Sequence, residues 1–162
     1  MGTAKELEDV AKQCRGFGSK VVSMVCDITS ETQVKAMVDT GIKEFGKIDI
    51  LINNAAWAKL GAIHEITEED VFAVINTNLI GTIRVCRYVV PHMIQQKDGC
   101  IINIASIVVR GVANLVPYVC SKAGILGLTR SLAFELAPHN IRVNTICYFL
   151  NPDLQRSWRK QR

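Results

Sequence analysis

Two hydrophobic patterns alternate along the chain. Continuous apolar runs predict buried strands at residues 21–28, 48–52, 100–105 and 141–146. Between them, apolar residues recur every three or four positions and predict helices at residues 3–15, 30–45, 67–96 and 118–137. Apolar strands that alternate with long helices are typical of a parallel sheet covered on both faces, so the sequence predicts the α/β class.

Capping residues and prolines suggest where these helices begin and end. Ser30 followed by Gln33 has the spacing of a capping box, and Thr67 is a good N-cap for the long third helix. Pro91 predicts a kink or a new start near the end of that helix, and Pro138 predicts the end of the fourth.

The composition is that of one globular domain, which we expect at residues 1–150. Hydrophobic residues make up 49% of the chain and charged residues 21%. No apolar run reaches the roughly 18 residues of a membrane span, and the first residues do not resemble a signal peptide. The expected location is therefore cytoplasmic, with no membrane partner.

The cysteines and histidines show no ligand spacing. Six cysteines are far apart with no C-x-x-C pair, and three histidines are equally scattered. Since a free cysteine behaves as a small hydrophobic residue, we expect reduced, mostly buried thiols and neither a metal site nor disulfides.

The net charge of +4 is concentrated in the last twelve residues, 151–162. This basic tail has four basic residues and one acidic residue. It could bind an anion such as a nucleic acid, but a disordered, solvated terminus is the favoured interpretation, so no nucleic-acid partner is expected.

Polar residues stand at the carboxyl ends of the predicted strands. Asp27 ends the first strand, Asn53 and Asn54 follow the second, and Ser106 follows the third. A single Asp or Asn at such a place is usually a turn or cap residue. Taken together they indicate a site, because ligands of open parallel sheets bind beyond the carboxyl ends of the strands.

Tyr118 and Lys122 carry the strongest chemical signal. A spacing of four residues puts both on one face of a helix, one turn apart. A cation close to a phenol, whose ordinary pKa is about 10, favours the phenolate, so we expect Lys122 to lower the pKa of Tyr118 toward neutrality. Ser106 stands 12 residues before Tyr118 and lacks a G-x-S-x-G context, so we expect it to orient a substrate oxygen rather than to attack it.

These motifs together resemble those of the classical short-chain dehydrogenase/reductase family. The similarity covers residues 3–146 and rests on four motifs in the family's order: Asn53-Asn54-Ala55-Ala56, Asn78-Leu79-Ile80-Gly81, Ser106 and Tyr118-x-x-x-Lys122. The resemblance implies a Rossmann-like, doubly wound parallel sheet and an oxidoreductase that moves a hydride between a nicotinamide and an alcohol or carbonyl substrate.

The same resemblance implies roles for individual residues. Tyr118 is the expected acid/base, Lys122 its helper and ribose ligand, Ser106 the ligand of the substrate oxygen, and Asn78 the residue that holds a relay water. Taken alone, Asn78 is better explained as a helix-interior amide bonded to the backbone. The cofactor, NAD or NADP, is expected to contact Asp27, Ile28, Asn54 and Ala55 as well as Tyr118 and Lys122.

The sequence departs from the family at both ends. The family's first two strands, the glycine-rich turn T-G-x-x-x-G-x-G between strand and helix, and the last strand have no counterpart, so the sheet is expected to be incomplete. The strand ending at Asp27 then either pairs directly with the strand ending at Ile52 or loses its place in the sheet. Without the turn, cofactor affinity is expected to fall, since backbone N–H groups there bind the pyrophosphate.

A second function therefore stays open beside the oxidoreductase. The chain could be a truncated, inactive member that associates with itself or with a full-length relative. The long helices at residues 68–96 and 118–137, through which family members commonly pair, are both retained.

Overall fold

The computed structural model describes residues 4–148 and confirms the α/β class. The basic tail predicted at residues 151–162 lies outside the described residues. In chain order the elements are α1 (Ala4–Gly16), α2 (Glu31–Phe45), β1 (Ile50–Asn53), α3 (Glu68–Ile75), the π-helix Asn76–Ile80, α4 (Gly81–Gln96), β2 (Gly99–Ile104), the 3-10 turn Ile107–Arg110, α5 (Val116–Leu136), the 3-10 turn Ala137–His139 and β3 (Ile141–Ile146).

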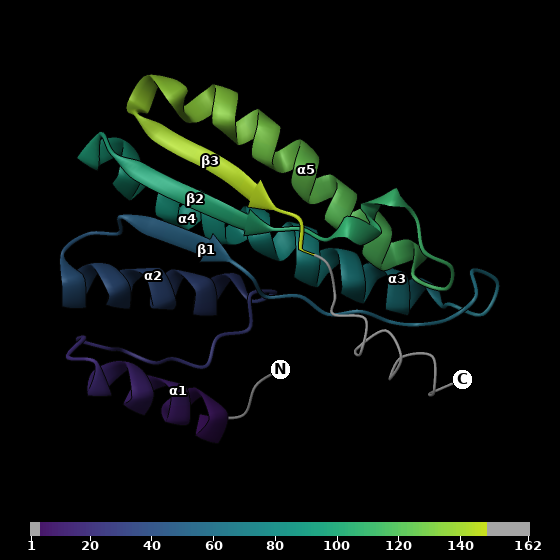
Figure 1. Cartoon of the computed structure of the whole chain (residues 1–162), viewed down its shortest axis with the longest axis horizontal. Coiled ribbons are helices and arrows are strands. Elements are labelled where there is room, and N and C mark those ends of the chain that lie inside the picture. Colours follow the sequence, from purple (N-terminus) through teal and green to yellow (C-terminus); the bar gives the residue numbers. More distant parts are fainter. Residues whose placement is uncertain (1–3, 149–162) are drawn as a thin grey trace.

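The described sheet is parallel and three-stranded, in the order β1-β2-β3 (Figure 1). Ile101 of β2 pairs with Leu51 of β1 and with Val143 of β3, so β2 alone has a strand on each side. Parallel neighbours need helical crossovers, and α3, α4 and α5 provide them. Three of the four predicted strands are thus confirmed, with small shifts at their ends.

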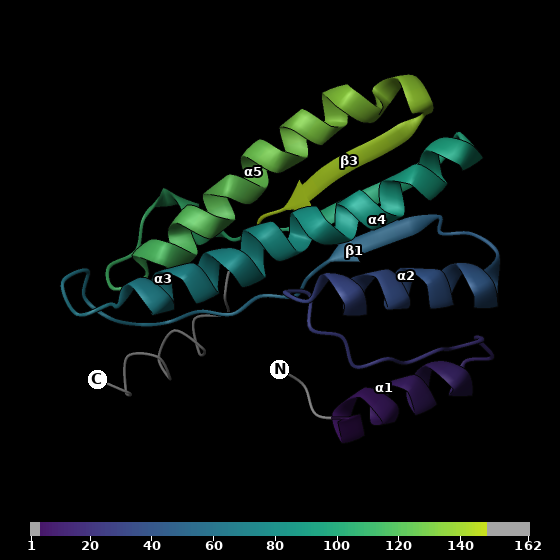
Figure 2. The same cartoon turned by 180° about the vertical axis from the view of Figure 1, so that it is seen from behind.

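The hydrophobic core lies between the sheet and helices α2, α4 and α5, which Figure 2 shows on one side of the strands. Met93 of α4, Ile101 of β2 and Leu136 of α5 are almost completely buried in it. The other face of the described sheet is open: Ile50 and Ile52 are each 59% exposed. Helices therefore cover a single face of the described strands.

The strand predicted at residues 21–28 is wrong. This segment is extended but makes no strand pairing, and it lies beside α1 and α2 rather than against β1. A strand exists only when its backbone groups pair with a neighbour, and no described strand borders this segment. Of the two outcomes expected from the sequence, the structure therefore shows the second: this segment does not pair with β1 and is not part of the described sheet.

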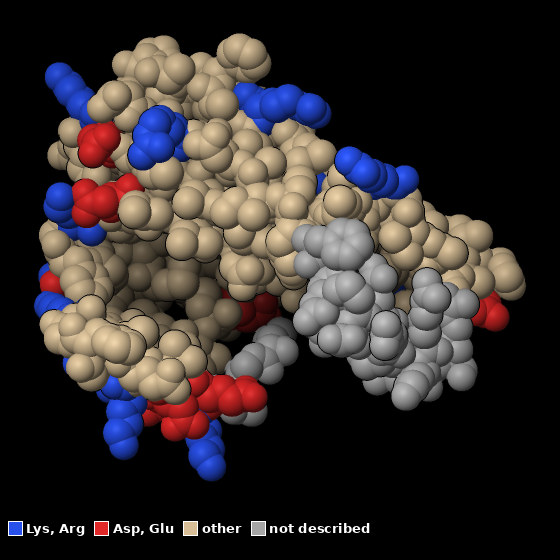
Figure 3. Space-filling model, viewed as in Figure 1, with Lys and Arg blue, Asp and Glu red and all other residues tan. Residues whose placement is uncertain are grey.

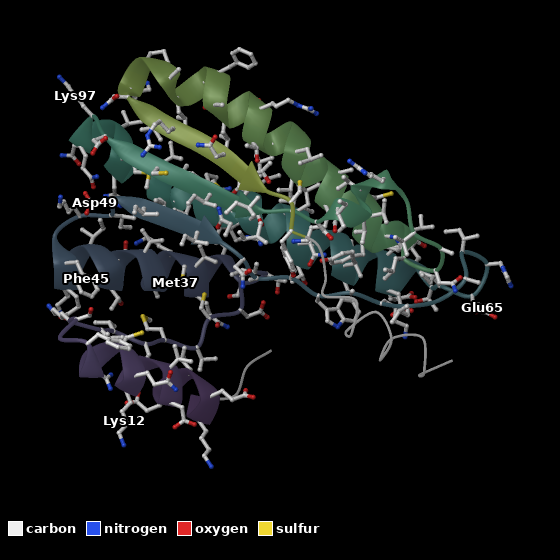
Figure 4. All side chains as sticks on the ribbon, viewed as in Figure 1. Lys12, Met37, Phe45, Asp49, Glu65 and Lys97 are labelled. Carbon is white, nitrogen blue, oxygen red and sulfur yellow. The ribbon has the colours of Figure 1, made fainter. Side chains whose placement is uncertain are left out.

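Apolar packing holds the N-terminal unit instead. A pocket between α1, residues 21–24 and α2 is lined by Leu7, Val10, Met37 and Phe45, among others. Met37 and Phe45 lie on the side of α2 nearest to α1 (Figure 4). Figure 3 shows a hollow between this unit and the rest of the molecule, with mostly uncharged walls. Val22, Met24 and Val25 remain 39%, 38% and 67% exposed. The hydrophobic pattern of residues 21–28 therefore corresponds to partial contact with helices and not to a paired, buried strand.

The long third helix is interrupted at a place the sequence did not indicate. The π-helix Asn76–Ile80 separates α3 from α4, and the Gly81 N–H donates to the Asn76 carbonyl. By contrast, α4 continues through Pro91, where a kink or a new start was predicted. Pro91 is exposed, and so is Arg87, whose carbonyl loses its usual helical donor and can be hydrated.

Helix ends follow the predicted caps with one difference. The Ser30 hydroxyl accepts from the Gln33 N–H at 3.4 Å, as in a capping box. The Gln33 side chain, however, accepts from the Asp27 N–H at 2.9 Å instead of returning to Ser30. It thereby fixes the end of the extended segment to the start of α2.

None of the described helices is both long enough and apolar enough to cross a membrane.

The two faces of the sheet predict different costs for the same substitution. Ile101→Ala removes a fully buried side chain between β2 and α4 and is expected to lower the free energy of unfolding by about 2–5 kcal/mol. The matched Ile50→Ala, on the open face, should cost about 0.5 kcal/mol. Urea unfolding followed by circular dichroism measures both. Equal losses would mean that the open face is covered in solution.

Candidate functional site

The carboxyl ends of β1 and β2 form one edge of the molecule, opposite Asp49 and Lys97, which mark the other ends of these strands in Figure 4. The loop after β1 carries Asn54 and Ala55, both exposed, and Ser106 follows β2 directly. Parallel pairing puts these loops side by side because Asn53 pairs with Asn103. The structure thus brings Asn53, Asn54 and Ser106 to one edge of the sheet, whereas Asp27 follows a segment that forms no strand.

A row of buried and half-buried polar side chains connects the three strands near this edge. Asn53 donates to the Asn103 carboxamide at 2.9 Å, and Asn103 donates to the Thr129 hydroxyl of α5 at 3.0 Å. The hydroxyl of Thr145, on β3, donates to the Asn103 carbonyl at 2.8 Å. Asn103 is completely buried, and losing one of its partners would leave a desolvated amide group. The row therefore fixes the three strand ends relative to one another and to α5.

Asn78 lies in the π-helix and is 1% exposed. Its carboxamide oxygen accepts from the Trp57 N–H, and its nitrogen donates to the Trp57 carbonyl, both at 2.8 Å. The same nitrogen donates to the Ser121 hydroxyl at 3.0 Å. The side chain thus clamps the loop after β1, in agreement with the backbone-bonding explanation for an isolated Asn. Its backbone carbonyl accepts from the Thr82 hydroxyl.

Ser106 is 1% exposed and is the N-cap of the 3-10 turn that follows β2. Its hydroxyl oxygen accepts from the Val108 N–H at 3.4 Å, which is a long and weak bond. No His, Asp or Glu side chain is among its described hydrogen-bond partners. The hydroxyl is therefore suited to hydrogen bonding and not to nucleophilic attack.

Tyr118 and Lys122 lie one turn apart on α5, as their spacing predicts. The Lys122 ammonium is 5.7 Å from the centre of the Tyr118 ring and donates to the Ile104 carbonyl at 2.7 Å. This bond ties the lysine to the last residue of β2. Lys122 is 3% exposed, and its burial lowers its pKa from the ordinary lysine value.

The predicted lowering of the Tyr118 pKa is wrong for this structure. The pKa of Tyr118 is raised, because partial burial separates the phenolate from water and the nearby Tyr148 adds a repulsive charge when both ionise. Lys122 does not offset this effect, since its ammonium is directed at the Ile104 carbonyl rather than at the phenol oxygen. The phenol therefore stays protonated at neutral pH.

Within residues 4–148, no three His, Cys, Asp or Glu side chains gather closely enough to hold a metal ion.

Comparison with known proteins shows which family this chain belongs to. A model of the short chain dehydrogenase family matches residues 2–162. The chain belongs to the short-chain dehydrogenase/reductase family. It is 39% identical over 143 residues to the 3-oxoacyl-(acyl-carrier-protein) reductase FabG of Thermotoga maritima, covering 88% of this chain and 58% of that protein.

Two further comparisons agree. The 1,6-dihydroxycyclohexa-2,4-diene-1-carboxylate dehydrogenase of Acinetobacter baylyi is 35% identical over 143 residues, covering 86% of this chain and 54% of the relative. The crystal structure of an NAD⁺-bound xylitol dehydrogenase superposes with a TM-score of 0.90 at 36% identity, covering 96% of this chain and 62% of that one. The chain thus spans somewhat more than half the length of these relatives.

In this member of the family, the residues that the sequence predicts for the adenine end of a cofactor are held by hydrogen bonds. Asp27 accepts from the Thr29 N–H and hydroxyl, both at 2.8 Å, and these bonds lower the pKa of its carboxyl group. The Ile28 carbonyl accepts from the Arg84 guanidinium at 2.7 Å. A Cβ on Gly81 would lie 2.8 Å from the Ile28 side chain, so this glycine permits close packing at the start of α4. Residues 27–28 therefore have a defined position, although the strand predicted at residues 21–28 does not form.

Two contributors to the site could not be recognised from the sequence. Trp57 takes part through its backbone N–H and carbonyl, so its residue type carries no signal. Ser121 is completely buried beside Lys122, and its only sequence signal is a small polar residue on the inner face of a helix.

The raised pKa of Tyr118 can be tested directly. Titration of the tyrosine ring carbons by NMR should show Tyr118 ionising above its ordinary value of about 10. Folding favours the protonated phenol, so the stability it contributes is present below about pH 10 and is lost as the pH rises through the higher folded value. Tyr148→Phe should lower the Tyr118 pKa, and Tyr118→Phe identifies its signal. Ionisation below the ordinary value would contradict the geometry of Lys122 described above.

Proposed function

We propose that this chain is an NAD(P)-dependent oxidoreductase that acts on an alcohol or carbonyl substrate. The main observation that supports this proposal is the position of Tyr118 and Lys122 on α5. Both lie at the carboxyl edge of the sheet, beside Ser106. Family membership supports the reaction class, and similarity to an NAD⁺-bound dehydrogenase supports the cofactor class. The substrate is proposed only as a small alcohol or carbonyl compound.

The residues at this edge would hold the nicotinamide half of the cofactor. Asn54 and Ala55 form an exposed, small-residue loop where a ribose and nicotinamide could approach the backbone, and Lys122 has an ammonium that can donate to ribose hydroxyls. Asp27 and Ile28 would contact the adenine. The turns after β1 and β2 contain no glycine-rich phosphate cradle, so these two turns do not supply such contacts to the pyrophosphate. The bound cofactor would supply or accept the hydride.

The proton chemistry then belongs to Tyr118. A phenol with a raised pKa is protonated at neutral pH and can donate its proton to a substrate oxygen that gains electrons during reduction. The Ser106 hydroxyl can hydrogen-bond the same oxygen and orient it without adding charge. Lys122, once nearer to the phenol oxygen, would stabilise the phenolate that remains. Asn78 is proposed to hold a relay water while its side chain fixes the Trp57 loop.

The first experiment is a titration of the purified chain with NADH and NADPH, followed by nicotinamide fluorescence and then by turnover of carbonyl substrates. Tyr118→Phe should retain binding and lose turnover by about 10²–10⁴-fold, the range typical of a lost general acid. Tyr88→Phe is the matched control and should keep both, since Tyr88 bonds to Glu31 on α2, away from this edge. Lack of binding up to about millimolar cofactor would reject the proposal. The binding free energy would then be at least about 4 kcal/mol weaker than that of a site with micromolar affinity.

A second function, an inactive chain that associates with itself or with a longer relative, is favoured by a different observation. Three helices expose large apolar side chains: Phe72 of α3 is 64% exposed, Ile83 of α4 42% and Phe134 of α5 84%. Exposed apolar residues of this size often mark interaction surfaces. Sedimentation analysis of the chain, alone and mixed with a full-length relative, distinguishes the cases: mixed oligomers without turnover support association alone.

We also propose a reducing, cytoplasmic location. All six cysteines are described and none forms a disulfide, although Cys14, Cys120 and Cys147 are exposed.

A further inference from the structure

Ser121 is a completely buried hydroxyl that connects two parts of the candidate site. Its O–H group donates to the Tyr118 carbonyl at 2.7 Å, and its oxygen accepts from the Asn78 carboxamide nitrogen at 3.0 Å. Asn78 in turn holds both backbone groups of Trp57. One continuous set of hydrogen bonds therefore runs from the loop after β1 to the helical turn that carries Tyr118.

Close packing of α5 against the π-helix makes this connection possible. A Cβ on Gly124 would lie 2.7 Å from a terminal methyl group of Leu79, the residue after Asn78. Gly124 follows Ser121 by three residues and so lies on the same face of α5. The absence of a side chain there brings α5 near enough for the Ser121 hydroxyl to reach Asn78.

The next residue along α5 provides an attachment in a second direction. The Lys122 ammonium donates to the Ile104 carbonyl of β2, whereas Ser121 is bonded to the π-helix. Consecutive helical residues point about 100° apart, so these two contacts hold the Tyr118 turn from two sides. Lys122 fixes it relative to the sheet, and Ser121 fixes it relative to Asn78 and Trp57.

We propose that Ser121 is a positioning residue of the candidate site: it holds the Asn78 carboxamide, and through it the Trp57 loop, in a defined place relative to Tyr118. The catalytic meaning of this role rests on the proposed oxidoreductase function. The positional role does not, because every contact that carries it lies within the chain.

A purely structural serine is the competing explanation, since serine hydroxyls inside helices often bond to a preceding carbonyl. Thr129 offers a matched control for it. The Thr129 hydroxyl donates to the Ile125 carbonyl at 2.8 Å and accepts from a buried carboxamide, that of Asn103, at 3.0 Å. It makes the same two kinds of bond two turns further along α5, and neither of these bonds involves Asn78 or Trp57.

Amide hydrogen exchange at Trp57 separates the two explanations without cofactor or substrate. Ser121→Ala should speed exchange of the Trp57 N–H by about tenfold, because Asn78 loses the contact that restrains it. Ser121→Thr keeps a hydroxyl and should restore slow exchange. Thr129→Val should lower global stability but leave Trp57 exchange unchanged relative to that stability. Equal effects of Ser121→Ala and Thr129→Val on Trp57, or no effect of Ser121→Ala, would overturn the proposal.

A double-mutant cycle tests the route of the effect and stays informative if Ser121→Thr does not fold. In an Asn78→Ala background, Ser121→Ala should change Trp57 exchange little further, because the link is already broken. Additive effects would overturn the route through Asn78. If the chain turns over, Ser121→Ala should also reduce kcat by about tenfold with the KM for cofactor unchanged. Absent turnover in the unsubstituted chain would reject the proposed function alone, since the exchange result is independent of it.

Discussion

The requirement that every buried strand has its backbone groups paired determines most of this structure. Among the described strands only β2 has neighbours on both sides, and β1 and β3 exist because they pair with it. The segment at residues 21–28 is as apolar as these strands, yet it forms none, because no described strand lies next to it. The same pairing aligns the carboxyl ends of β1 and β2, and this alignment creates the edge where the candidate site lies.

Buried polar groups then determine the fine geometry of that edge. Asn103, Asn78 and Ser121 are each almost completely buried, and each finds partners on other elements. An amide or hydroxyl removed from water without a partner is costly, so the arrangement with all bonds made is strongly preferred over alternatives. The loop after β1, the π-helix and α5 are consequently held together, although they lie far apart in the sequence.

The proposed proton transfer depends on how closely the Lys122 ammonium approaches the Tyr118 phenol. With Lys122 bonded to the Ile104 carbonyl, burial controls the pKa of Tyr118 and the phenol is kept protonated. This state suits proton donation in a reduction, whereas accepting a proton in an oxidation needs the ammonium nearer to the phenol oxygen. The positions of two side chains on one helical turn thus bear on the direction of the proposed reaction.

The sequence by itself determined the α/β class, helices such as α1 and α5, three of the four strands, and the family, because hydrophobic period and motif spacing are local properties of the chain. Only the tertiary structure decided that residues 21–28 pair with no strand, that the helix changes to a π-helix at Asn76 rather than bending at Pro91, and that Lys122 faces a backbone carbonyl. The roles of Ser121 and the Trp57 backbone also came from it. Each depends on a neighbour distant in sequence, and the pattern of one segment does not record which partner will satisfy its polar groups.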